Sequence, residues 1–174
     1  MIELLILYIL TQREYTMYGI SKEIESRFGV YTRPSFGAIK PALRKLISEG
    51  FLDCRKSMSD GGKLSVYYEL TKTGEKELIK LIKKELTPNP LQFISNAKIK
   101  LSMADMLTKE DRAELLLHLK TLAISFKQSA ENILNDEYTD KNFYQKILLD
   151  NSSVEYSNLI NIIEGFEKDN ARNS

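Results

Sequence analysis

The stretch SFGAIKPALRKLISEG, residues Ser35–Gly50, decides the fold of this 174-residue chain. Apolar side chains recur in it at helical spacing and form one stripe: Ile39, Leu43, Leu46 and Ile47. Ser35 is a suitable N-cap, and Gly50 closes the helix. Pro41 removes one backbone hydrogen bond within the first two turns, so we expect a local distortion but no break. The pattern predicts an amphipathic helix over about residues 35–49.

A β-hairpin is predicted directly after this helix. Residues 51–56 and 64–70 flank the segment SMSDGG, in which Asp60-Gly61 is a strong turn signal. The second run carries Val66, Tyr67 and Tyr68, which favour strand. The two runs are therefore expected to pair as neighbouring strands.

Helical patterns surround this unit on both sides. Residues 2–12 and 18–28 carry apolar side chains three and four positions apart, and residues 72–86 follow Thr71 as an N-cap. The order helix, helix, helix, hairpin, helix defines a winged helix-turn-helix, whose third helix is placed to enter the major groove of DNA. We therefore predict a mainly α fold that begins with a winged helix.

Short motifs in this part of the chain resemble the PadR family of transcriptional regulators. The matching stretches are Tyr18-Gly19-Ile20, RPSFGAIKPALRKL (33–46), Glu49-Gly50, Asp60-Gly61-Gly62 and YYELT (67–71) with Gly74. The resemblance covers about residues 1–80. It implies a DNA-binding regulator that acts as a homodimer on a palindromic operator, most often as a repressor.

Two positions depart from the family pattern. Family members usually carry Tyr where this chain has Lys40, and basic residues where it has Ser65 and Val66. The hairpin is therefore expected to hold phosphate less strongly, or to do so through Lys63, Arg55 and Lys56.

DNA binding requires cations and short polar groups on one exposed face, because phosphates dominate affinity and base edges set specificity. Lys40 and Arg44 lie four residues apart, opposite the apolar stripe, and are assigned to base edges or phosphates. The remaining candidates are Ser35 and Phe36 at the start of the third helix, Lys63 in the hairpin and Tyr18 at the start of the second helix. The alternatives are a solvated surface for the cations and a packing role for Tyr18.

The second half of the chain differs in composition and charge. Residues 1–86 hold 15 Lys and Arg against 11 Asp and Glu, whereas residues 87–174 hold 10 against 13. The segment Thr87–Pro90 disfavours helix, and neither Gly nor Pro occurs between Leu91 and Glu164. We predict two domains, a winged-helix DNA-binding domain over 1–87 and an all-helical dimerisation domain over 91–170.

The helices of the second half carry more apolar surface than one small bundle can bury. This surplus favours a homodimer. The expected interface residues are Ile94, Leu101, Leu115, Leu119, Leu122, Phe126, Leu159, Ile163 and Phe166. A self-contained bundle is the alternative. The polar segment 150–153 would line a ligand pocket, form a contact across the dimer or face water. The family resemblance implies a small aromatic effector, for which Phe126, Phe143, Tyr144 and Tyr156 would supply stacking.

Other functions find little support in the sequence. With one Cys and one His, a metal site would have to be built mostly from carboxylates, and no metal-ligand spacing appears. We expect no cofactor, and no nucleophile–base set or Gly-rich phosphate loop indicates an enzyme. Residues 1–10 are too short to span a bilayer and lack the features of a secretory signal, so a cytoplasmic protein is expected. The second hypothesis is a winged helix that binds an acidic protein instead of DNA. The target gene, the operator sequence and the direction of regulation are not encoded in these patterns.

Overall fold

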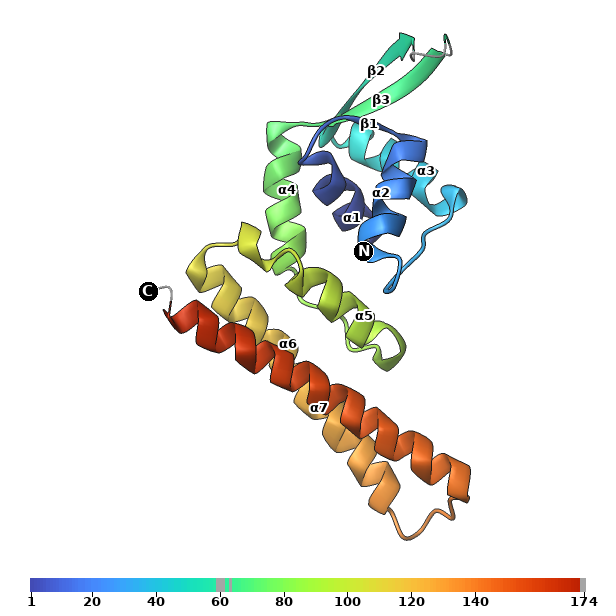
Figure 1. Ribbon diagram of the computed structural model, residues 1–174, viewed down its shortest axis with the longest axis vertical. Coiled ribbons are helices and arrows are strands. Elements are labelled where there is room, and N and C mark those ends of the chain that lie inside the picture. The colour runs from blue at the N-terminus through green and yellow to red at the C-terminus, as the bar shows by residue number, and fades with distance from the viewer. Residues whose placement is uncertain (59–61, 63, 173–174) are drawn as a thin grey trace. The chain divides into compact units, whose positions relative to one another are not determined.

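The chain folds into two compact units, Met1–Lys84 and Glu85–Ser174, in a computed structural model that describes residues 1–58, 62 and 64–172 (Figure 1). The first unit contains four helices and three strands: α1 (Ile2–Leu10), β1 (Tyr15–Thr16), α2 (Met17–Phe28), α3 (Phe36–Ser48), β2 (Leu52–Met58), β3 (Leu64–Leu70) and α4 (Lys72–Lys83). The predicted mainly α fold with a winged helix is confirmed. The turn signal Asp60-Gly61 lies outside the described residues.

The core of the first unit is built around α1. This helix is apolar on nearly all sides, which is typical of a helix that other helices cover. It packs against α2, α3 and α4 (Figure 1). The side chains that close this core are fully or almost fully buried: Leu5, Ile6, Leu7, Ile20, Ile24, Ile39, Leu43, Leu46, Leu78 and Ile82.

The sheet has a strand that the sequence pattern did not indicate. The order is β1-β3-β2 and all pairs are antiparallel, with Tyr15 opposite Tyr68 and Cys54 on the other side of Tyr68. The two-residue β1 is too short to show an alternating pattern. It also starts the next helix, because the Thr16 hydroxyl accepts a hydrogen bond from the Gly19 N–H at 3.1 Å.

Helix α3 is continuous through Pro41. Ser35 is its N-cap by position, although its hydroxyl makes no capping hydrogen bond. At the other end Gly50 has φ +73°, a left-handed backbone conformation that glycine adopts without the penalty that other residues incur. The chain turns there directly into the strands β2 and β3, which form the wing. The end of α3 and the start of β2 are therefore fixed to each other.

The wing is joined to α4 by a close contact of backbones. The Thr71 hydroxyl accepts from the Gly74 N–H at 3.0 Å and donates to the Gly50 carbonyl at 2.8 Å. A Cβ atom at Gly74 would lie 2.1 Å from the Phe51 carbonyl oxygen. Only glycine fits this position without a shift of the backbone.

The second unit is wholly helical in its described part. It contains α5 (Pro90–Leu101), the short 3₁₀ helix η1 (Ala104–Met106), α6 (Lys109–Asn135) and α7 (Phe143–Arg172). The long helices α6 and α7 form an antiparallel hairpin (Figure 1). Lys120 of α6 forms ion pairs with Glu164 at 3.1 Å and Glu167 at 2.8 Å, and these carboxylates raise the pKa of Lys120.

The predicted interface residues divide into two groups. Packing within the single chain buries Leu101, Leu115, Leu119, Leu159 and Ile163. Ile94, Leu122 and Phe126 are half-buried, and Phe166 is 45% exposed. Contact of any of them with a second copy stays a prediction.

Replacement of Gly74 by Ala is expected to destabilise the first unit by roughly 1–3 kcal/mol, because the new methyl group must displace the Phe51 carbonyl. The matched control is Gly37→Ala in α3, where a Cβ meets nothing closer than the Ser35 hydroxyl at 3.6 Å. This control should retain or gain stability. Urea unfolding followed by circular dichroism measures both, and equal stability of the two variants would contradict this packing.

Candidate nucleic-acid interface

One face of α3 is buried and the opposite face is exposed. Ile39, Leu43 and Leu46 turn into the core and leave less than 3% of their surface accessible. The exposed face carries Phe36, Lys40 and Arg44, which follow one another at intervals of four residues. Because side chains four apart share a helix face, these three lie along one side of α3.

The cations of α3 differ in what they bind. Lys45 donates to Glu3 at 2.8 Å, and this carboxylate raises the pKa of Lys45. Within the described part of the chain, neither Lys40 nor Arg44 forms an ion pair. An anion that binds these two side chains therefore displaces only water.

Other cations near α3 are already engaged. In α2, Lys22 pairs with Glu25 at 2.9 Å and Arg27 pairs with Glu23 at 3.2 Å. Arg33 donates to the Gly29 carbonyl at 3.1 Å. Lys40 and Arg44 of α3 differ from these three cations in that no described residue binds their charged groups.

Arg44 also lies within electrostatic reach of the wing. Burial and the neighbouring Cys54 raise the pKa of Tyr68 in β3, and the charge of Arg44 opposes this rise.

The N-terminus of α3 offers polar groups as well. The Ser35 carbonyl accepts from the Ala38 and Ile39 N–H groups at 2.9 and 3.0 Å, while the Ser35 side chain is exposed. The first N–H groups of a helix have no carbonyl partner within it and attract anions. Ser35 is thus placed where a phosphate would be accepted.

Tyr18 and Phe36 are brought together by the fold. Their rings are nearly parallel, at an interplanar angle of 13° and a centroid distance of 6.4 Å. Tyr18 is 62% exposed and Phe36 is 46% exposed. The start of α2 and the start of α3 therefore present a shared aromatic surface. The sixth predicted DNA contact, Lys63, lies outside the described residues.

The wing contains an ion pair that the sequence analysis missed. Arg55 of β2 donates through Nε to Glu14 at 2.8 Å and through a second nitrogen to the same carboxylate. Its guanidinium also lies 5.2 Å from the centre of the Tyr67 ring. Forty-one residues separate the two partners, so no local pattern could reveal the pair. Lys56 is exposed and forms no ion pair with any described residue.

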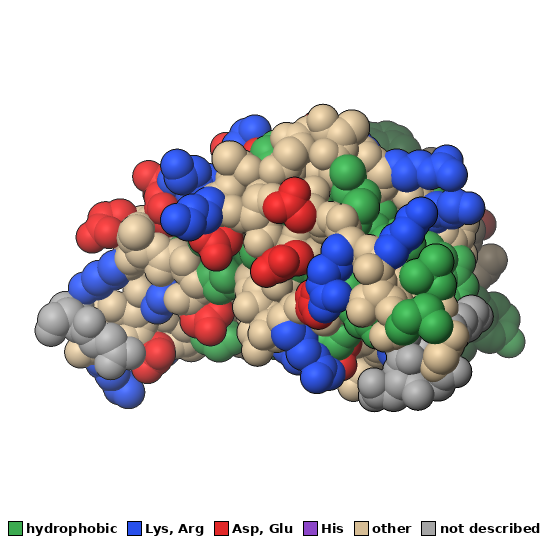
Figure 2. Space-filling view, turned by 90° about the horizontal axis from the view of Figure 1, so that it is seen from above, with side chains coloured by type: hydrophobic (Ala, Val, Ile, Leu, Met, Phe, Trp, Pro, Cys, Tyr) green, Lys and Arg blue, Asp and Glu red, His purple; other side chains and the backbone are tan. Residues whose placement is uncertain are grey.

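Figure 2 shows one face of the molecule, on whose right-hand part Lys and Arg side chains lie beside hydrophobic side chains. In the first unit Tyr18, Phe36, Lys40, Arg44 and Lys56 are all exposed. We call this set the α3 surface.

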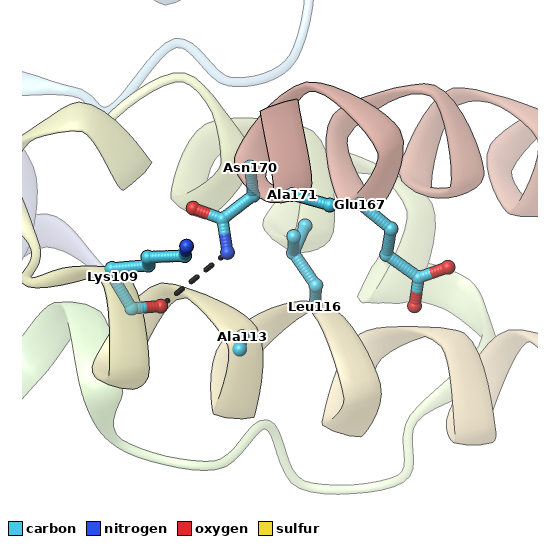
Figure 3. Close-up of a pocket in the computed structure, with 6 residues that line it drawn as sticks. All are labelled: Lys109, Ala113, Leu116, Glu167, Asn170 and Ala171. Atoms are coloured by element: carbon cyan, nitrogen blue, oxygen red, sulfur yellow. Dashed lines mark hydrogen bonds between the residues drawn. The ribbon is translucent and has the colours of Figure 1, made fainter. Parts of the chain in front are cut away.

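The described residues of the helical unit line at least two pockets. One, of ≈530 Å³, lies between α5 and α7 and is lined by Ile94, Ser95, Ser152 and Tyr156 among others. The other, of ≈340 Å³, lies between the start of α6 and the end of α7, where Asn170 donates to the Lys109 carbonyl at 3.4 Å (Figure 3). Only the first has an aromatic side chain in its lining.

The described residues offer neither a metal site nor a helix that crosses a membrane. They contain no group of three or more His, Cys, Asp and Glu side chains that could hold a metal ion. None of their helices combines the length and apolarity needed to cross a bilayer.

The chain is similar to several solved structures. Among solved structures, the chain is 33% identical to smu.1704 from Streptococcus mutans UA159, and the match covers 47% of this chain and 73% of that one with a TM-score of 0.42. It is 18% identical to Bacillus subtilis PadR in complex with operator DNA, covering 94% and 95% of the two chains with a TM-score of 0.44. It is 19% identical to smu.1604c from the same Streptococcus strain, covering 95% and 98% with a TM-score of 0.46. No curated protein gives a significant match.

The family model for "Transcriptional regulator PadR-like family" matches residues 6–80, the stretch that forms most of the winged helix. Members of this family regulate transcription and are not enzymes. The resemblance of the winged-helix part of the chain to the PadR-like family of transcriptional regulators is thus confirmed for residues 6–80.

Proposed function

We propose that this regulator binds a palindromic operator as a homodimer and represses the gene beside it. The observation that carries the proposal is the pair of exposed, unpaired cations Lys40 and Arg44 on α3, opposite the buried stripe of the same helix. In a winged helix-turn-helix this face of the third helix enters the major groove. Lys and Arg contact either phosphates or guanine edges there. Contacts to phosphates release counterions.

Replacement of Lys40 and Arg44 by Gln is expected to weaken binding to the chain's own promoter DNA. If both side chains neutralise phosphates, the slope of log K against log salt should become less steep by about 0.9 for each. Mobility shifts or fluorescence anisotropy at several salt concentrations measure this slope.

The matched control is Lys45→Gln, on the same helix but bound to Glu3. It should leave the slope nearly unchanged. Full DNA affinity in the double variant would instead favour the second hypothesis, a winged helix that binds an acidic protein.

The wing provides a separate test of phosphate contacts. Lys56→Gln is expected to reduce the salt slope by up to about 0.9, because Lys56 has no competing carboxylate. Arg55→Gln should change it little, since Glu14 already binds Arg55 through two nitrogens. Titrations with both variants at matched salt concentrations compare them directly. An equal loss in both variants would mean that DNA displaces Glu14.

An apolar stripe on α7 supports a homodimer. Tyr156, Leu159 and Ile163 are buried, but a different face of α7 exposes apolar side chains at helical spacing: Tyr144, Ile147, Leu148, Val154, Ile162 and Phe166. Exposed apolar side chains that gather on one helix face favour an association site. A second copy is the economical occupant, because two α3 helices about 34 Å apart would read half-sites one turn apart.

We propose repression because a dimer that covers the promoter would compete with RNA polymerase for the same DNA. The paired contacts also explain why each half-site alone would bind weakly, since the second subunit binds at a high effective concentration. Footprinting of the promoter would reveal the two half-sites.

One chain has a mass of 20.0 kDa, and the purified protein is expected to form particles of twice this mass in solution at micromolar concentration. The double variant Ile147→Asp, Phe166→Asp places charges on the exposed stripe and should shift the protein towards monomer. Lys146→Glu is the control, an exposed change on the same helix outside the stripe. Light scattering coupled to gel filtration gives the masses, and a monomeric parent protein would contradict the dimer.

The proposal includes release of the operator by a small aromatic molecule. The pocket between α5 and α7 supports this, because Tyr156 lines it and carries a ring for stacking. Phe126 stacks on Tyr156 at a centroid distance of 5.5 Å and holds the ring in place. Of the four aromatic residues considered from the sequence, these two lie together, whereas Phe143 and Tyr144 form their own contact at 5.6 Å.

A further inference from the structure

The N-terminal half of α3 carries few side chains that can form hydrogen bonds. Over the first seven residues of the helix, Phe36–Ala42, the only polar side chain is Lys40. Hydrogen bonds to base edges are made by Arg, Lys, Asn, Gln, Ser and similar side chains. At the N-terminal turn, where bases are contacted first, this helix therefore offers an aromatic ring and a glycine.

The ring is held in an exposed position by its neighbour. Phe36 is 46% exposed and stacks on Tyr18, which is itself 62% exposed. Lys22, four residues after Tyr18, lies with its ammonium 6.0 Å from the Tyr18 ring centre. The pair thus forms a flat apolar surface with a cation at its edge, and neither ring is needed to fill the core.

Space next to the ring allows close approach. Gly37 has no side chain, and a Cβ there would meet only the Ser35 hydroxyl, at 3.6 Å. Lys40 follows one turn later on the same side of α3. A base pair can therefore approach the backbone at Gly37 with Phe36 on one side and Lys40 on the other.

In the major groove the distinctive apolar group is the 5-methyl of thymine, and Phe is among the residues that contact it. We propose that Phe36, backed by Tyr18, recognises a thymine methyl group in each half-site and so determines specificity at that position. This inference rests on the proposed function, in which α3 enters the major groove.

Deoxyuridine tests the inference because it lacks only that methyl group. The operator is first located by footprinting, and each thymine of one half-site is then replaced in turn by deoxyuridine. Loss of a buried methyl corresponds to about a fourfold rise in Kd. We expect this rise at one or two positions for the unmodified protein and no rise at the same positions for Phe36→Ala.

Tyr18→Phe is the matched control, because it keeps the stacked ring and removes the hydroxyl. It should retain the penalty for deoxyuridine. Thermal melts establish that each variant is folded before its Kd is compared.

The outcomes separate this inference from the proposed function. Salt-dependent binding to the operator with no penalty at any deoxyuridine overturns the methyl contact and leaves operator binding intact. An equal penalty in the unmodified protein and Phe36→Ala assigns the contact to another residue and also overturns it. Absence of binding to any promoter DNA overturns both.

Discussion

The burial of one stripe of α3 against α1 is the constraint on which the interface depends. Ile39, Leu43 and Leu46 can be removed from water only if the helix turns that face inward. Their spacing then fixes Phe36, Lys40 and Arg44 on the outside. A rotation of the helix that hid Lys40 would expose a leucine or isoleucine and bury a charge, and each change costs free energy. Hydrophobic packing of α3 thus determines which of its side chains face the solvent.

Charge pairing then selects which cations are available. The near-neutral composition gives no indication of a DNA-binding surface, because most basic residues around α3 are matched by carboxylates. Glu3 binds Lys45, Glu25 binds Lys22 and Glu14 binds Arg55, and these exposed pairs contribute little to stability. Their effect is to leave the α3 surface with Lys40, Arg44 and Lys56 as cations without a carboxylate among the described residues. The positions of the cations without a carboxylate partner therefore indicate the DNA-binding surface better than the net charge does.

Much of the first unit could be predicted from local patterns. The stripe of α3, the turn at Gly50 and the N-cap at Thr71 each depend on residues within a few positions, and each is present in the structure. Strand β1 could not be predicted, since two residues show no period. The contact of Arg55 with Glu14 could not be predicted from the sequence either, because it depends on how β1, β3 and β2 lie side by side. Burial of Leu119 and Ile163 within one chain illustrates the same limit: an apolar stripe indicates a contact but does not identify its partner.

The central claim is that the exposed face of α3 contacts duplex DNA. Backbone amide chemical shifts of the isotope-labelled protein, recorded with and without promoter duplex, test it residue by residue. The largest changes should fall on residues 35–45 and on β2, with the buried residues of α7 nearly unchanged. Changes confined to α6 and α7, or no changes at DNA concentrations that saturate other probes of binding, would contradict the claim.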